Sequence, residues 1–452
     1  MYVLSFFFVI LAQINGLIMV MMRYTGKYLI ALSMIGGMLL TSCHKEVFDE
    51  DKYDDILDYS SPVDSVDAKH TWELTQDHIY VVEADMKVGA TSVLILPDNP
   101  LTALNVEVMA QSPIEDGGKV MLAATVPTRF SELYAALVDS RGRYTVVSFP
   151  VGSTVINFSN AKETNRLKTT KARFTQQQLV YCFEEEMPEP GDYDYNDVVL
   201  RLSREVVDSR HLKIEVELAA VGGSKQLAAG LRLVGFKAED IDSVTIESGN
   251  SFDMGGSNHD VPLQKMASPL FESSSLLQTA RNGDAFLYLF EDAHWAMGED
   301  LTVTNQIFQR KKYNVSKSFG NEMMILPTRT EIYHVYFKTD GVVTGFTPGM
   351  FDPFILSPSW GFVWELHCFR DCEAQVTREY SLSSTKTKHL PWALMIPYAS
   401  FRYPLEGVNI GFKKNGGYFG AYMNKGCSFG EWAEDRTKCL DWYTSPTFNR
   451  IF

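Results

Sequence analysis

The sequence predicts a mainly all-β protein with two β-sandwich-like units. In residues 72–172, short runs rich in β-branched and aromatic residues, such as HIYVVEA, VMLAATV and LYAALVD, are separated by turns such as Asp116-Gly117-Gly118. Evenly spaced short strands with such turns are typical of a β-sandwich. The same pattern continues beyond Phe174 with longer loops, and few segments show the 3.6-residue period of a helix. We therefore expect an N-terminal β-sandwich over residues 71–173 and a second β-rich unit over residues 174–452.

Alternating side chains support the second unit. The apolar residues Ile214, Val216 and Leu218 are interleaved with charged residues, which predicts a strand with one buried and one wet face. AFLYLF and IYHVYFKTDGVV are two further predicted strands, and the second contains its own Thr-Asp-Gly turn.

The N-terminal region, residues 1–43, has the layout of a secretory signal. Arg23 and Lys27 precede an apolar run, YLIALSMIGGMLL, that is too short for a comfortable membrane span. The run ends in Leu-Thr-Ser-Cys43, which resembles the lipobox of bacterial lipoproteins, where the cysteine carries diacylglycerol. We expect Cys43 to be lipidated with acyl chains such as palmitate, and several chains on one residue anchor a protein firmly. A chance cysteine after an ordinary signal peptide is the alternative.

The first twenty residues do not belong to this layout. They are apolar and carry no charge before the second apolar run begins. Their length alone would allow a membrane span. We favour a misplaced start codon, with synthesis beginning at Met21 or Met22.

An acidic segment, residues 44–70, follows the predicted lipid anchor. Its like charges repel one another, so we expect an extended tether. Acidic residues directly behind a lipidated cysteine resemble the signal that sends lipoproteins of Bacteroides-like bacteria to the outer face of the outer membrane. We therefore expect a lipid-anchored protein of the cell outer membrane, exposed on the surface or facing the periplasm. A solvated spacer is the alternative interpretation of the tether.

The overall charge excludes one class of partner. The 452 residues carry a formal net charge of −15, whereas nucleic-acid binding needs a basic surface. We therefore expect no nucleic acid, and instead a membrane attachment and a glycan or surface protein as partner.

Five cysteines remain after Cys43. An exported protein is free to form disulfides, and Cys368, Cys372, Cys427 and Cys439 are the disulfide candidates because they form the nearest pairs in sequence. The pairing cannot be read from sequence. Zinc is the rival interpretation, but no CxxC pair is present.

The segment that best predicts chemistry is an acidic turn between two predicted strands. Asp192, Asp194, Asn196 and Asp197 alternate closely, and calcium prefers six to eight oxygen ligands. Glu184 or Glu185 on the preceding strand would complete the shell, so we expect calcium as cofactor. The loop is not an EF-hand, because Asp197 and Ser203 occupy positions that require Gly and Glu. A metal-free turn with side chains bonded to local amides is the alternative.

The same segment carries a family resemblance. Phe183-Glu184-Glu185, followed by GDYDYNDVV, resembles the opening of the LruC domain, which occurs in exported lipoproteins of Bacteroides-like bacteria. Further pieces match in order over residues 174–452: LAAVGGSKQLAAGLRL, LFEDAHWAMG, DPFI, ELH, LPWAL, FRYP and DWY. The sequence departs from the family after His367, where Cys-Phe-Arg-Asp-Cys replaces an apolar loop. The resemblance implies an envelope lipoprotein with a cation site, but no biochemical activity.

Two other groups of residues are candidates for a functional role. Glu365, His367 and Asp371 form a possible acid/base or metal cluster, in which the first two share a strand face. A structural role for the histidine is favoured, because a catalytic zinc needs a third ligand within reach. Late aromatic residues, among them Trp432 and Trp442, form either a platform for sugar rings or a core, and we favour a core.

Together these features predict a non-enzymatic, calcium-stabilised lipoprotein of the cell envelope that displays a binding surface for glycan or protein. One alternative is a metal-dependent hydrolase acting on glycan, which would use the acidic turn together with Glu365 and His367. A second alternative is a subunit of a surface fibre that accepts a neighbour's strand.

Overall fold

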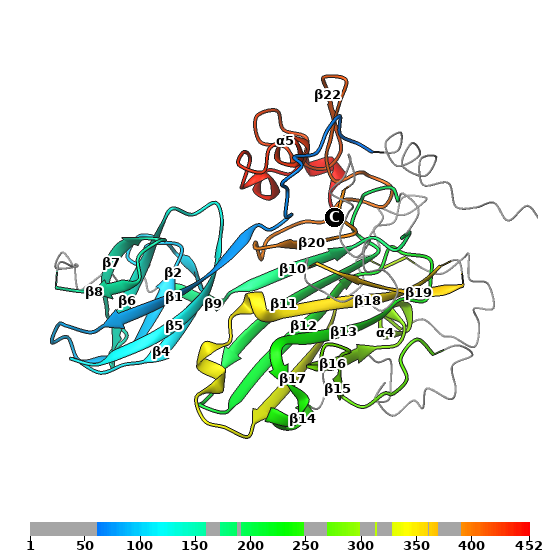
Figure 1. The fold of residues 1–452 in the computed structure, drawn as a ribbon. Coiled ribbons are helices and arrows are strands. Elements are labelled where there is room, and N and C mark those ends of the chain that lie inside the picture. The colour runs from blue at the N-terminus through cyan, green and yellow to red at the C-terminus, as the bar shows by residue number, and fades with distance from the viewer. Residues whose placement is uncertain are drawn as a thin grey trace, which may run out of the picture. The chain divides into compact units, whose positions relative to one another are not determined.

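Antiparallel sheets dominate the computed structural model, which confirms the predicted all-β class (Figure 1). The structure describes residues 61–159, 172–187, 191–247, 269–298, 312–313, 328–359, 361–368 and 390–452, and these belong to one compact unit. Cys43, the acidic segment up to residue 60, Asp371 and Cys372 lie outside the described residues. Among the helices that the structure describes, none has the length and apolar composition needed to cross a membrane.

Two sheets form the N-terminal sandwich. One has the order β5-β1-β8 and the other the order β4-β2-β6-β7. A shared core lies between them, to which β1 contributes Tyr80 and Val82 and β2 contributes Val93 and Ile95. The strands are β1 (Thr75–Glu83), β2 (Ala90–Leu96), β3 (Asn105–Val108), β4 (Ala110–Pro113), β5 (Lys119–Pro127), β6 (Glu132–Asp139), β7 (Tyr144–Pro150) and β8 (Val155–Asn157).

Two larger sheets form the second unit. Their orders are β14-β17-β12-β11-β10-β20 and β15-β16-β13-β18-β19, and a single apolar core contains side chains from both (Figure 1). The strands are β9 (Arg173–Gln176), which pairs with β3, and β10 (Gln178–Phe183), β11 (Val198–Val206), β12 (His211–Ala220), β13 (Ala228–Lys237), β14 (Ile241–Ile246), β15 (Leu277–Thr279), β16 (Asp284–Phe290), β17 (Arg329–Phe337), β18 (Phe351–Ser359), β19 (Phe362–His367) and β20 (Ala393–Ile396).

Strand β12 shows why the alternating pattern predicts this architecture. Ile214, Val216 and Leu218 are fully buried, whereas Glu215 and Glu217 on the opposite face are half-buried. Successive side chains of a strand point to opposite faces, so one face of β12 enters the core between the sheets.

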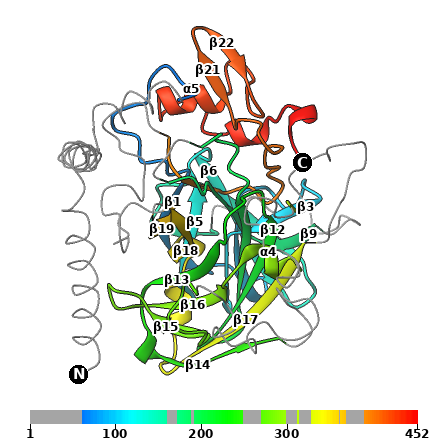
Figure 2. The ribbon, with the colours of Figure 1, turned by 90° about the vertical axis from the view of Figure 1, so that its right-hand side faces the viewer.

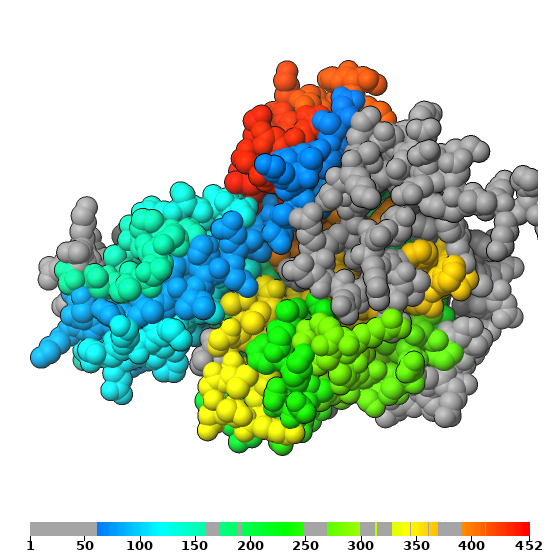
Figure 3. Space-filling view, in the orientation of Figure 1, coloured from blue at the N-terminus to red at the C-terminus, as the bar shows by residue number. Residues whose placement is uncertain are grey.

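An aromatic cluster joins the two ends of the described chain. Trp432, Trp442 and Tyr443 are buried against residues of β10 and β20, so the predicted core role of the late aromatic residues is confirmed. Phe419 is an exception, with half of its surface exposed. Trp72, which precedes β1, packs edge-on against Trp432. Accordingly, the segment before β1 lies beside the C-terminal segment in Figure 3.

The remaining elements are short. Figure 2 shows helix α5 and the hairpin β21–β22 gathered at one end of the molecule. Ser428 caps α5 by accepting from the backbone N–H of Glu431, whose carboxylate accepts in return from Ser428. This reciprocal capping satisfies amides that a helix start leaves unpaired. The elements are β21 (Phe412–Lys414), β22 (Gly417–Phe419), α4 (Ala293–Ala296), α5 (Phe429–Glu434), η1 (Ala238–Asp240), η5 (Val342–Gly345), η6 (Pro348–Met350), η7 (Trp442–Thr444) and η8 (Phe448–Arg450).

Candidate metal centre

The acidic turn connects two neighbouring strands of the six-stranded sheet. Strands β10 and β11 are antiparallel, and Phe183 at the end of β10 is in register with Val198 at the start of β11. Glu184 and Asp197 are the next residues beyond this pair. The connection therefore starts and finishes with two carboxylates that the sheet itself places close together.

Backbone conformation within the turn brings further carboxylates inward. Tyr193 and Tyr195 both adopt left-handed conformations, with φ of 57° and 54°. Side chains other than glycine rarely adopt this region, so the turn stores some strain. Tyr195 is held in place because its N–H donates to Glu184 Oε1 at 2.6 Å and its hydroxyl donates to the Pro391 carbonyl at 2.5 Å.

Two overlapping groups of carboxylates result. Glu184, Asp192 and Asp194 form the first group, and Glu184, Glu186 and Asp197 form the second. Within each group, one oxygen of each residue lies within 4.8 Å of the others. Glu184, Asp194 and Asp197 are buried, whereas Asp192 is exposed. We call these five residues the acidic cage.

Several oxygens in and beside the acidic cage have no hydrogen-bond partner. Backbone amides satisfy part of it: Asp194 accepts from Gly407 N at 2.7 Å, and Asp197 accepts from Glu185 N at 2.7 Å. In contrast, one side-chain oxygen of each of four residues is buried without a partner. These are Glu184 Oε2, Glu186 Oε2, Asn196 Oδ1 and Glu406 Oε2. Such atoms are rare in folded proteins, and the binding of an ion is a recognised reason for them.

Two glycines leave the space that these oxygens occupy. A β-carbon on Gly222 would lie 1.9 Å from Asn196 Oδ1 and 2.9 Å from Glu406 Oε2. A β-carbon on Gly191 would lie 2.2 Å from Glu184 Oε2 and 3.1 Å from Glu186 Oε2. Any larger residue would displace the oxygens, so both positions need glycine.

Electrostatics make the acidic cage unfavourable without a cation. Burial, together with the charge of Glu186, raises the pKa of Glu184 well above its usual range. Burial and neighbouring carboxylates raise the pKa of Asp194 and Asp197 in the same way. Lys312 supplies one positive charge, but it contacts Glu406 in an ion pair that keeps the pKa of the lysine above its usual value despite burial. A bound divalent cation would favour the ionised forms of the cage carboxylates.

The predicted ligands are only partly those of the acidic cage. Glu184, Asp192, Asp194 and Asp197 come together, and the amide oxygen of Asn196 lies nearby at Gly222. Glu185 lies outside both groups. Its carboxylate accepts from Ser224 N at 2.8 Å, Ser224 Oγ at 3.0 Å and Lys225 N at 3.0 Å, so it anchors the loop after β12.

Sequence reasoning missed two carboxylates. Glu186 follows directly after two glutamates that were named as candidates, so its position in the acidic run was an available signal. Glu406 lies far away in sequence and reaches the site through the C-terminal segment, so no local pattern marks it. It enters because Gly407 N bonds to Asp194 and Glu406 itself pairs with Lys312.

A comparison with known protein families assigns most of the second β-rich unit to one family. Residues 208–443 match the family described as "Domain of unknown function (DUF4842)". The chain belongs to this family. The acidic turn precedes the residues matched to DUF4842, whereas Gly222, Lys312 and Glu406 lie inside the match.

Other comparisons add little to the DUF4842 assignment. A crystal structure of a candidate lipoprotein from Bacteroides ovatus is similar over 80% of this chain and 99% of its own, with 16% sequence identity and a TM-score of 0.47. No curated protein matches the chain. The resemblance to the LruC domain stays a prediction.

A second polar group lies in the DUF4842 region, on the five-stranded sheet. His367 lies between two carboxylates, with Nδ1 2.8 Å from Asp352 Oδ2 and Nε2 2.8 Å from Glu365 Oε1. Asp352 also forms an ion pair with Arg232 at 2.8 Å. The prediction that Glu365 and His367 share a strand face is confirmed, but neither belongs to the acidic cage.

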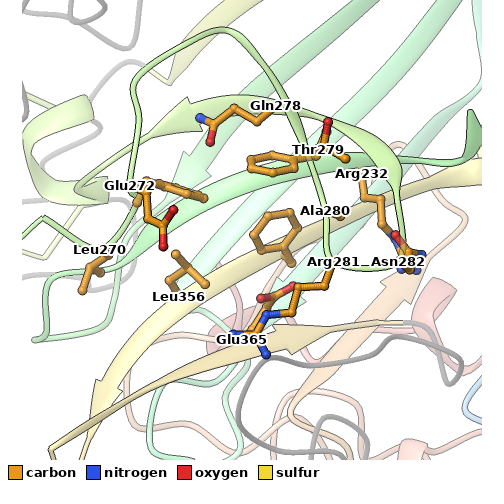
Figure 4. A pocket seen from close by; sticks show the side chains of 13 residues that line it. Arg232, Leu270, Glu272, Gln278, Thr279, Ala280, Arg281, Asn282, Leu356 and Glu365 are labelled. Carbon is orange, nitrogen blue, oxygen red and sulfur yellow. The ribbon is translucent and has the colours of Figure 1, made fainter. Parts of the chain in front are cut away.

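A cavity of about 190 Å³ adjoins this polar group. Three phenylalanine rings that line it pack against one another, with centroids 5.5 to 6.2 Å apart. Figure 4 shows Glu272, Gln278, Arg232 and Glu365 spaced around the cavity. The lining residues include Phe271, Phe286, Phe354, Leu270, Leu356 and Arg281.

Among the cysteines that the structure describes, Cys182, Cys427 and Cys439 are free thiols. Cys182 and Cys368 are buried, and Cys427 and Cys439 are half-buried. Cys439 Sγ lies 3.5 Å from the carbonyl oxygen of Gly426, the residue next to Cys427. The four cysteines named from the sequence as disulfide candidates stay a prediction, and no pairing is assigned to them.

Proposed function

We propose that this DUF4842 protein is a non-enzymatic lipoprotein of the cell envelope whose β-rich unit is stabilised by calcium. The observation that carries the proposal is the acidic cage, in which the carboxylate oxygens Glu184 Oε2 and Glu186 Oε2 are buried without a partner. A buried, unpaired polar group costs about 1–3 kcal/mol and a charged one costs more. A cation bound at the cage would remove this cost.

The donor set favours calcium over other metals. All five residues of the two groups offer carboxylate oxygens, the nearby Asn196 offers an amide oxygen, and neither histidine nor cysteine belongs to the groups formed by the described residues. Zinc prefers nitrogen and sulfur ligands, and magnesium is rarely enclosed by protein ligands alone. Calcium accepts six to eight oxygens in a flexible geometry. Extracellular calcium sites bind at about 10⁻⁴–10⁻³ M, so the site is suited to an exported protein.

Thermal melting with added calcium tests the proposal. Purified protein treated with chelator should melt at a higher temperature as calcium is added, because only the native state forms the cage. Magnesium at the same concentration should shift the melting temperature less. Glu184→Gln should abolish the calcium response, whereas Glu185→Gln should retain it, because Glu185 bonds to amides and a hydroxyl instead. A melting temperature that does not respond to saturating calcium would refute the ion site.

The lipid anchor is supported by the sequence. The basic residues, the apolar run and the small residues before Cys43 together have the layout of a lipoprotein signal. Cys43→Ser should release the protein from the membrane fraction. Mass spectrometry of the N-terminal peptide should show the mass of the acyl chains in the wild type and not in the variant. A Cys43→Ser variant that stays in the membrane fraction and keeps the added mass of the acyl chains would contradict lipidation at Cys43.

The cavity in the DUF4842 region is the proposed binding surface, and we assign it to one ring of a glycan. The phenylalanine rings that line it offer apolar contact to the C–H face of a sugar, while Glu365, Gln278 and Arg232 supply acceptors and donors for hydroxyls. Binding is favoured over metal-dependent hydrolysis because both ring nitrogens of His367 are already engaged by carboxylates.

Ligand-observed NMR with envelope and dietary oligosaccharides tests the cavity. Glu365→Gln should weaken saturation transfer to the sugar protons, and Glu132→Gln, an exposed carboxylate on β6, serves as the control. Cleavage of any oligosaccharide during the incubation would overturn the non-enzymatic assignment. Equal saturation transfer in the two variants would show that the sugar does not bind in the cavity.

A further inference from the structure

The acidic cage consists of two groups that share one residue. Glu184 belongs to both, while Asp192 and Asp194 complete the first group and Glu186 and Asp197 complete the second. The oxygens of all five residues do not lie within 4.8 Å of one another. We propose that the cage holds two calcium ions side by side, bridged by the carboxylate of Glu184, which rests on the proposed calcium function.

Geometry separates the two ion positions. Calcium–oxygen distances are about 2.3–2.6 Å, so two ligands on opposite sides of one ion are about 5 Å apart. Each group satisfies that spacing by itself. The oxygens of all five residues do not fit within this spacing, so two neighbouring ions, each bound by one group, reach every carboxylate at a shorter distance than one shared ion would.

The hydrogen bonds of Glu184 are suited to a bridging role. Its Oε1 accepts from Tyr195 N at 2.6 Å, which fixes the orientation of the fully buried carboxylate. Its Oε2 has no partner, and the Oε2 atom of Glu186 has none either. Both of these oxygens approach the position of a β-carbon on Gly191, at 2.2 and 3.1 Å. The two unpartnered atoms therefore lie near the same point beside Gly191, where the sequence alone predicted no separate ion.

The charge of the acidic cage also supports two ions rather than one. The five cage residues carry five negative charges when ionised, and a single calcium ion would leave three of them uncompensated in a mostly buried site. Two calcium ions would leave one. Lys312 lies close enough to raise the ionised fraction of its neighbours, but it is already paired with Glu406. An unpaired buried charge is strongly unfavourable, so the second ion is the simpler source of compensation.

Counting bound ions tests the inference on the full chain. After treatment with chelator, isothermal titration with calcium chloride should give two ions per chain, and native mass spectrometry should show the same number. Asp192→Asn alters only the first group and Glu186→Gln only the second, so each variant should bind one ion. Glu185→Gln, outside both groups, should bind two.

The outcomes distinguish the inference from the proposed function. One ion in the wild-type protein, lost in Asp192→Asn but kept in Glu186→Gln or the reverse, would overturn the pair while the calcium site survives. No bound ion would overturn both. Far-ultraviolet circular dichroism identifies any variant that fails to fold, and the two single-group variants still decide the count if Glu184→Gln is unfolded.

Discussion

Raising the pH in the absence of calcium should destabilise this protein, because the acidic cage is protonated more readily in the native state than in the unfolded state. Burial and the charges of Glu185 and Asp192 raise the pKa of Glu186 from 4.5 to about 7. Between these values the native state binds more protons than the unfolded state, so stability is fully present below pH 4.5 and is lost as the pH rises through 7. One pKa unit corresponds to 1.36 kcal/mol, so the loss attributable to Glu186 is about 3 kcal/mol.

Other groups titrate in the same range, so the comparison must be made between variants. Glu107 and Glu291 also have pKa values raised to about 7 by burial, which adds a loss of the same sign. Burial lowers the pKa of His70 to about 4, which acts in the opposite direction between pH 4 and 6.5. These contributions cancel when the wild type is compared with Glu186→Gln at each pH.

The assay is urea denaturation followed by tryptophan fluorescence at pH 5, 6, 7 and 8. In chelator, Glu186→Gln and the wild type should be similar at pH 5, and the variant should be more stable by about 3 kcal/mol at pH 8. In calcium the difference at pH 8 should largely disappear, because the wild type binds one ion more than the variant and gains about 2.7 kcal/mol from it at a calcium concentration 100 times the Kd. If the difference in unfolding free energy between wild type and variant does not change with pH in chelator, the pKa of Glu186 is not raised in the native state.

Three further predictions concern the surrounding structure. Trp432→Ala should lower the free energy of unfolding by about 3–5 kcal/mol, because the ring is 1% exposed in the aromatic cluster; urea denaturation measures this, and a loss below about 1 kcal/mol would contradict a core role. Glu185→Gln should cost about 1–3 kcal/mol without changing the number of calcium ions bound, since it weakens the bonds to Ser224 and Lys225; denaturation and titration together check it. Cys182 should resist iodoacetamide in the native protein, because it is fully buried and burial raises the pKa of its thiol; alkylation before unfolding, detected by mass spectrometry, would show that the strand is not packed as described.

Features that depend on neighbours in sequence were predictable. The alternation at positions 214–218 predicted a strand with one buried face, because side chains on a strand alternate between two faces. The spacing of Glu365 and His367 predicted a shared face for the same reason, and the two side chains do hydrogen-bond to each other. The acidic turn was visible because its carboxylates are crowded within a few residues.

Features that depend on pairing between distant strands were not predictable. Asp352 reaches His367 because β18 and β19 pair with Phe354 opposite His367, and no local pattern indicates that register. Glu406 approaches the cage through the C-terminal segment. Which of Glu184 and Glu185 belongs to the cage also depends on tertiary structure. The loop at Ser224 hydrogen-bonds to the carboxylate of Glu185, whereas the carboxylate of Glu184 points into the cage.

Anomalous diffraction from crystals grown with calcium would locate the ions in the acidic cage directly. We expect two anomalous peaks beside Glu184 Oε2, one coordinated by Asp192 and Asp194 and the other by Glu186 and Asp197. The ligand distances should be about 2.3–2.6 Å. Crystals in which saturating calcium leaves the cage without anomalous density, and in which the carboxyl groups bond to one another or to lysine instead, would contradict the calcium site.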